Sequence, residues 1–110
     1  MIGLGIGVTI VSAVKALFVT GAILAVVSVL TWDRIQAWFK QREALYKSDT
    51  DNIAFSLVEK IEQGQFKVVY GLFNKRTQHL IEADAVAAES LDQTLLEYHD
   101  KEPLVIYPCP

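Results

Sequence analysis

Few residues in this chain are of the types that catalyse reactions or hold metals. The only cysteine, Cys109, stands between two prolines, where no neighbouring element is expected to enclose it. The two histidines, His79 and His99, have no cysteine or second histidine within a helical turn, whereas a zinc site needs further ligands at such spacings. The sequence therefore predicts no catalytic residue, no metal ligand and no cofactor, and it favours a protein that is not an enzyme.

Two short patterns of glycine and basic residues carry equally little chemistry. Gly3, Gly5 and Gly7 spell GxGxG, but no strand–helix unit surrounds them, so phosphate binding is not expected. Lys75 and Arg76 lie in a polar turn and are candidate contacts for a protein partner, although a solvated turn explains them equally well. The net charge of −3 gives no reason to expect nucleic acid, and no small-molecule substrate is expected.

The strongest feature of the sequence is its apolar N-terminal part. From Met1 to Trp32 the sole charged side chain is Lys15. A bilayer core requires about 20 helical residues, so we predict one transmembrane helix with its core over about residues 11–32, within an apolar segment over 1–32. Residues 1–10 add apolar length that one span does not need. A cleaved signal peptide fits less well, because no basic residue precedes Lys15 and no small-residue cleavage site follows the apolar run.

Two sets of side chains would position this helix. Small residues at helix-packing spacing allow a second helix to approach closely; these are Ser12, Ala16, Thr20, Gly21 and Ala25. Basic and aromatic residues favour the interface between membrane and water; these are Lys15, Trp32, Arg34, Trp38, Phe39, Lys40 and Arg42. Because most basic residues follow the apolar run, we expect a plasma (inner) membrane or virion membrane, with the N-terminus outside and the C-terminal domain in the cytoplasm.

The remaining residues predict a small α+β domain. Apolar side chains three or four positions apart over 33–48 are typical of an amphipathic juxtamembrane helix. In the cytoplasmic domain over 49–110, a similar spacing predicts a helix over about 51–63 that ends at Gly64. Alternating apolar residues over 65–73 indicate a strand, and residues 78–86 are expected to return as its hairpin partner.

Two interpretations of residues 83–99 remain open. Ser90 and Gln93 resemble a capping box, which favours a strand followed by a short helix over 90–99, while the alanine content of 83–99 also fits one longer helix. Leu104 to Tyr107 is expected to form a final strand, in which Leu104 and Ile106 are candidate partner contacts. The expected fold class is a membrane-anchored α+β protein with a helix–β-hairpin–helix–strand domain.

This organisation favours a positional role over a chemical one. The leading hypothesis is a non-enzymatic, single-pass structural or accessory subunit of a membrane-embedded assembly, including a membrane-containing virion. Its partners would be the lipid bilayer and other membrane-protein subunits or copies of itself. The alternative is a membrane-tethered binding module, in which the hairpin or the short strand from Leu104 to Tyr107 recruits a soluble partner by edge pairing.

Overall fold

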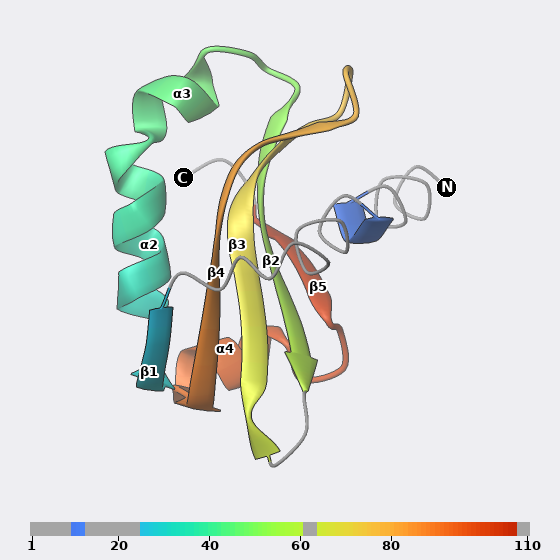
Figure 1. Cartoon of the computed structure of the whole chain (residues 1–110). Coiled ribbons are helices and arrows are strands. Elements are labelled where there is room, and N and C mark those ends of the chain that lie inside the picture. Colours follow the sequence, from blue (N-terminus) through green and yellow to red (C-terminus); the bar gives the residue numbers. More distant parts are fainter. Residues whose placement is uncertain (1–9, 13–24, 61–63, 108–110) are drawn as a thin grey trace.

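One mixed β-sheet organises the molecule. The computed structural model describes residues 10–12, 25–60 and 64–107, and in these the strands follow the order β1-β4-β3-β2-β5 (Figure 1). Strand β1 runs parallel to β4, and the other neighbours are antiparallel. The strands are β1 (Ala25–Leu30), β2 (Asn52–Lys60), β3 (Phe66–Asn74), β4 (His79–Leu91) and β5 (Leu104–Tyr107). The molecule is therefore a small α+β domain with a five-stranded mixed sheet.

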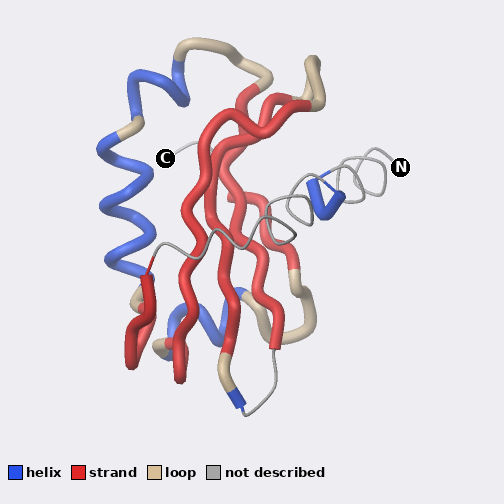
Figure 2. Tube along the Cα trace, viewed as in Figure 1, coloured by secondary structure: helices blue, strands red, loops and turns tan. Residues whose placement is uncertain are grey.

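The hairpin of β3 and β4 forms the centre of this sheet and confirms the predicted hairpin. Its tip extends beyond the neighbouring strands (Figure 2). A Cβ atom at Gly71 would lie 2.4 Å from the backbone oxygen of Glu82, which is closer than carbon and oxygen can approach. The two central strands can therefore approach each other here only because this position is glycine.

Three short helices complete the described part of the chain beyond residue 25: α2 (Trp32–Gln41), α3 (Glu43–Lys47) and α4 (Gln93–Tyr98). The Thr31 hydroxyl caps α2 by accepting a hydrogen bond from the Arg34 amide, and Asp92 caps α4 by accepting one from the Leu95 amide. Such caps satisfy amides that a helix leaves without an internal partner. The predicted helix over 33–48 is thus two helices, and residues 83–99 form a strand followed by a helix.

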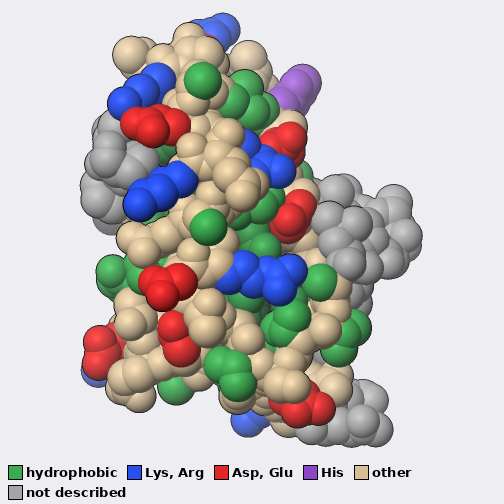
Figure 3. Space-filling model, turned by 90° about the vertical axis from the view of Figure 1, so that its left-hand side faces the viewer, with side chains coloured by type: hydrophobic (Ala, Val, Ile, Leu, Met, Phe, Trp, Pro, Cys, Tyr) green, Lys and Arg blue, Asp and Glu red, His purple; other side chains and the backbone are tan. Residues whose placement is uncertain are grey.

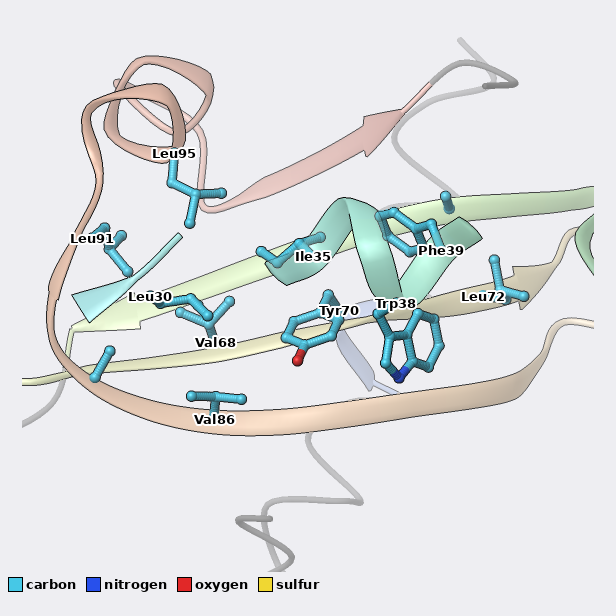
Figure 4. Close-up of a cluster of buried hydrophobic side chains, with 12 residues drawn as sticks. Leu30, Ile35, Trp38, Phe39, Val68, Tyr70, Leu72, Val86, Leu91 and Leu95 are labelled. Carbon is cyan, nitrogen blue, oxygen red and sulfur yellow. The ribbon is translucent and has the colours of Figure 1, made fainter. Parts of the chain in front are cut away.

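Helix α2 covers one face of the sheet. Ile35, Trp38 and Phe39 point from this helix onto the sheet (Figure 4). Leu95 of α4 closes one end of the same cluster. The other buried members are Leu30, Ala54, Val68, Tyr70, Leu72, Val86, Ala88 and Leu91. This cluster is the larger of the two hydrophobic cores in the described residues.

The opposite face of the sheet has its own, smaller core. Phe55, Leu57, Val69, Phe73 and Ala85 are buried there. A helical turn at residues 10–12 lies against this face, and Ile10 is fully buried in the same cluster. Residues from the apolar N-terminal part therefore contribute to the core of the folded domain.

Two predicted helices are strands in the structure. Ala25–Leu30, expected at the end of the transmembrane helix, forms β1 and pairs with β4. Asn52–Lys60, expected as a helix, forms β2. β2 is buried on both faces at its middle, and its Ile53, Leu57 and Val58 also recur at the spacing of one helical face, which is why the sequence pattern predicts a helix there. No helix in the described ranges combines the length and the apolarity that crossing a membrane requires.

The expected helix-packing residues have three different positions relative to the fold. Three of them fall outside the described residues, namely Ala16, Thr20 and Gly21, as does Lys15 of the interface set. Ser12 is exposed. Ala25 begins β1 and pairs with Val86, so strand pairing takes the place of the expected helix contact at this position.

A substitution at Leu30 tests whether the end of the apolar run belongs to the domain core. Leu30→Ala should lower the free energy of unfolding by about 2–5 kcal/mol, because it opens a cavity beneath α2. Val29→Ala, one residue earlier but half exposed, should cost less than about 1 kcal/mol. Denaturant unfolding followed by tryptophan fluorescence measures both values. Equal, small losses would show that Leu30 does not pack in the core.

Candidate functional site

Three polar side chains from distant parts of the chain meet at one side of the sheet. The Ser56 hydroxyl on β2 lies 2.7 Å from Nε2 of His99 and 2.6 Å from the hydroxyl of Tyr107 on β5. Nδ1 of His99 lies 2.9 Å from the backbone oxygen of Glu102. This is the arrangement of residue types that nucleophilic catalysis uses, with a hydroxyl beside an oriented imidazole.

The contacts of His99 determine the direction of each hydrogen bond. Because a carbonyl only accepts, Nδ1 must donate to Glu102, and in the neutral ring Nε2 then accepts from the Ser56 hydroxyl. The Ser56 oxygen in turn accepts from the Tyr107 hydroxyl. Burial lowers the pKa of His99, against the smaller raising effect of the backbone groups of Glu102 and Pro103. The imidazole is therefore held neutral, in a single tautomer.

The burial of Ser56 decides what this cluster does. Its side chain is fully buried, so no substrate can reach the hydroxyl in this conformation. Burial also raises the pKa of Tyr107 to about 12, so its hydroxyl stays protonated and acts as a donor. The cluster therefore joins β2, β5 and the end of α4 as a network in which each member has a partner.

Aromatic side chains surround this network. Trp32 lies 5.1 Å from Tyr98 and 4.8 Å from Tyr107, measured between ring centroids, and Tyr107 also contacts Phe39. Of the aromatic residues predicted at the membrane interface, Trp38 and Phe39 are buried in the core and Trp32 is half-buried. The predicted helical spacing is present, and the apolar side of the helix faces the sheet.

The expected interface cations have different surroundings. Arg34 and Lys40 are exposed on α2, whereas the guanidinium carbon of Arg42 lies 3.9 Å from the centre of the Trp38 ring. Arg42 also forms an ion pair with Glu82. On the side of the molecule where α2 lies, basic and acidic side chains are interspersed (Figure 3). The exposed part of this side is therefore mixed in charge.

The predicted partner contacts at the hairpin tip are partly used within the domain. Arg76 forms ion pairs with Asp49 and with Asp51, while Lys75 is exposed. The Asp51 amide donates to Asp49, and this bond and Arg76 lower the pKa of the Asp49 carboxyl. Arg76 thus fastens the turn between β3 and β4 to the segment that precedes β2.

β1 and β5 are the outermost strands of the sheet, and no other described strand pairs with their outer sides. β1 exposes 76% of Val26 and 50% of Val29, and β5 exposes 41% of Ile106. Leu104 is half-buried beside the smaller core. Backbone N–H and C=O groups on such edges can pair with an added strand.

Comparison with known proteins adds no further constraint on this site. No protein-family model, no curated protein and no solved structure matches the chain. Within the described residues, no group of three or more His, Cys, Asp and Glu side chains could hold a metal ion.

The depressed pKa of His99 predicts a pH-dependent stability. The unfolded chain binds a proton at this ring more readily than the folded domain does, so the free energy of unfolding should fall as the pH drops from 7.5 to 5. In His99→Gln this part of the pH dependence should disappear, and stability at pH 7.5 should fall by about 1–3 kcal/mol through loss of the network. Denaturant titrations at several pH values measure both effects.

His79→Gln is the matched control for this experiment, because His79 is exposed on β4. That variant should retain the decline in stability between pH 7.5 and 5. A decline of the same size in His99→Gln would contradict the assignment of the effect to His99. The pKa values of the Glu43 and Asp49 carboxyls are lowered in the folded domain. Their contribution to the pH dependence of the free energy of unfolding therefore lies below this pH window.

Proposed function

We propose that this chain is a non-enzymatic, membrane-tethered binding module, in which the outer edge of β1 pairs with an extended segment of a partner protein. The observation that carries the proposal is the exposure of Val26 and Val29 on an outermost strand. Added strands gain affinity from backbone hydrogen bonds and specificity from pockets or surfaces for alternate side chains. β1 supplies the backbone groups, because no other described strand pairs with its outer side, and its exposed valines supply an apolar contact surface.

The sequence of β1 distinguishes it from the other edge. Natural sheets protect their edges with lysine, proline, bulges or very short strands. β5 has four residues, and prolines stand on both sides of it. β1 reads AVVSVL and contains no charged residue, no proline and no glycine. An edge without protection is an aggregation hazard unless it has a partner, so we assign the docking role to β1.

The proposed tether is the apolar sequence immediately before β1. Residues 1–24 contain one charge, Lys15, and their number exceeds the roughly 20 that a helical span needs. Arg34, Lys40 and Arg42 follow on α2. By the positive-inside rule, these residues support a cytoplasmic domain, an outside N-terminus and a plasma (inner) or virion membrane.

A structural or accessory subunit of a membrane assembly is the second candidate. The apolar residues before β1 exceed one span in length, and surplus apolar sequence of this kind can pack against other membrane-protein subunits or copies of the same chain. The two candidates differ in the stability of the complex. A subunit would purify in detergent with fixed stoichiometry, and a binding module would purify alone and capture its partner reversibly.

Site-specific photocrosslinking in cells tests the docking edge. A photoreactive amino acid in place of Val26 should give a discrete crosslinked adduct. The same amino acid in place of Leu96, an exposed apolar residue on helix α4, should not. Val29→Lys in the Val26-labelled chain should weaken the adduct, because edge lysines disfavour strand addition. The absence of any adduct at position 26, or equal adducts at 26 and 96, would refute docking at β1.

Membrane retention tests the tether separately. Leu17→Arg should reduce the fraction of chain that resists alkaline carbonate extraction, since arginine inside a span costs insertion free energy, up to about 2.5–3.5 kcal/mol at its centre. Leu45→Arg, on the exposed surface of α3, is the control and should leave retention unchanged. The tether is ruled out if carbonate releases the unaltered chain, or if both variants behave like it.

A further inference from the structure

A small cavity lies between α2 and the central strands of the sheet. Its volume is about 230 Å³, and it opens to solvent beside the exposed residues Arg34 and Gln41. This is below the range of about 300–1,000 Å³ that is common for drug-sized ligands, so an occupant must be small. The lining residues are Arg34, Ala37, Trp38, Gln41, Tyr70 and Asp84.

Trp38 brings an unused hydrogen-bond donor to this cavity. Its side chain is only 6% exposed, and its Nε1 is the one buried side-chain nitrogen or oxygen without a hydrogen-bond partner in the described part of the chain. Figure 4 shows the indole nitrogen and the Tyr70 hydroxyl pointing to the same side, toward β4. This nitrogen lies below the surface of the cavity, so a ligand acceptor must shift the lining side chains to reach it, and the new hydrogen bond would satisfy the unpaired donor.

The indole is also held in place by its neighbours. Its ring packs edge-on against Phe39 and Tyr70, at centroid distances of 5.5 and 5.6 Å. Arg42 covers one face of the ring and donates to the Trp38 backbone oxygen at 3.2 Å. The donor is therefore fixed before any ligand arrives, which reduces the entropic cost of binding.

Two opposite charges line the same cavity without neutralising each other. Neither Arg34 nor Asp84 forms an ion pair within the described residues. Tyr70 pairs with Asp84 across the strands β3 and β4, and burial together with the Asp84 charge raises the pKa of Tyr70 more than Arg34 lowers it. The tyrosine is therefore a neutral donor. The cavity offers a cation and two neutral donors together with one anion.

We propose that this cavity binds a small zwitterion of the free amino-acid class. The carboxylate of the ligand would accept hydrogen bonds from the Arg34 guanidinium and Trp38 Nε1, a pairing to which guanidinium geometry is suited. The ammonium group would contact the Asp84 carboxylate. The cavity is separate from the β1 edge, so this proposal does not depend on the proposed docking function.

Tryptophan fluorescence of the full chain can measure binding directly. Trp32→Phe leaves Trp38 as the sole indole, and its emission should change with saturation when free glycine, alanine or serine is titrated up to millimolar concentrations. Acetate and methylammonium, which carry only one of the two charges, should bind at least tenfold more weakly. The absence of a saturable change with any of the three amino acids would overturn the proposal.

Three variants assign the contacts in this Trp32→Phe background. Arg34→Gln should weaken amino-acid binding about tenfold to a hundredfold, the range expected for a hydrogen bond to a charged group. Asp84→Asn should weaken binding of amino acids but not of acetate. Lys40→Gln, an exposed cation of α2 outside the cavity lining, is the matched control and should leave the affinity unchanged.

A fourth variant, Trp38→Phe, removes the donor while retaining an aromatic ring. Calorimetry should show weakened amino-acid binding, and thermal unfolding should show that the domain still folds, with some loss of stability because the smaller ring leaves a cavity in the core. Unchanged affinity in both Trp38→Phe and Arg34→Gln would contradict the proposed carboxylate contacts. Equal binding of acetate and glycine, together with an Asp84→Asn variant that behaves like wild type, would contradict the zwitterion assignment.

Discussion

The packing of α2 on the central strands is the contact on which the rest of the structure depends. Ile35, Trp38 and Phe39 bury the inner side of this helix, and each large apolar side chain removed from water contributes about 1.5–3 kcal/mol. β1 leads directly into α2, so the same packing holds the exposed edge in register. It also forms the roof of the small cavity and places Phe39 against Tyr107. Both proposed interaction sites would be lost if α2 detached.

The strands show where sequence reasoning succeeds and where it fails. The alternation of Phe66, Val68 and Tyr70 predicts β3, because one face of a strand recurs at every second residue. In β2, Ile53, Leu57 and Val58 also recur at the spacing of one helical face, so its sequence fits a helix as well as a strand. β1 is six residues of a much longer apolar run, and periodicity alone cannot distinguish a buried strand from a buried helix in such a run. Its identity comes from pairing with β4, which local sequence does not encode.

The sites were less predictable than the strands, for a related reason. Ser56 lies 43 positions from His99 and 51 from Tyr107, so no motif in the sequence marks their contact. The spacing of Trp32, Trp38 and Phe39 shows an amphipathic helix, but it does not show whether lipid or a sheet covers the apolar side. The hydrogen-bond donor beside the cavity is the indole nitrogen of Trp38. Its direction follows from the packing of Phe39, Tyr70 and Arg42 around the ring, which the sequence does not show.

The apolar N-terminal part has two competing environments. Ile10 is buried against Phe55 and Phe73, and Ala25 already belongs to β1, so residues 13–24 alone lie between these fixed points. As a helix those twelve residues would extend about 18 Å, whereas a bilayer core is about 30 Å thick. A crossing by residues 1–24 therefore requires Ile10 to leave the sheet. The tethered form would then expose the Phe55 face as well as the β1 edge, so membrane insertion and the need for a protein partner would be physically coupled.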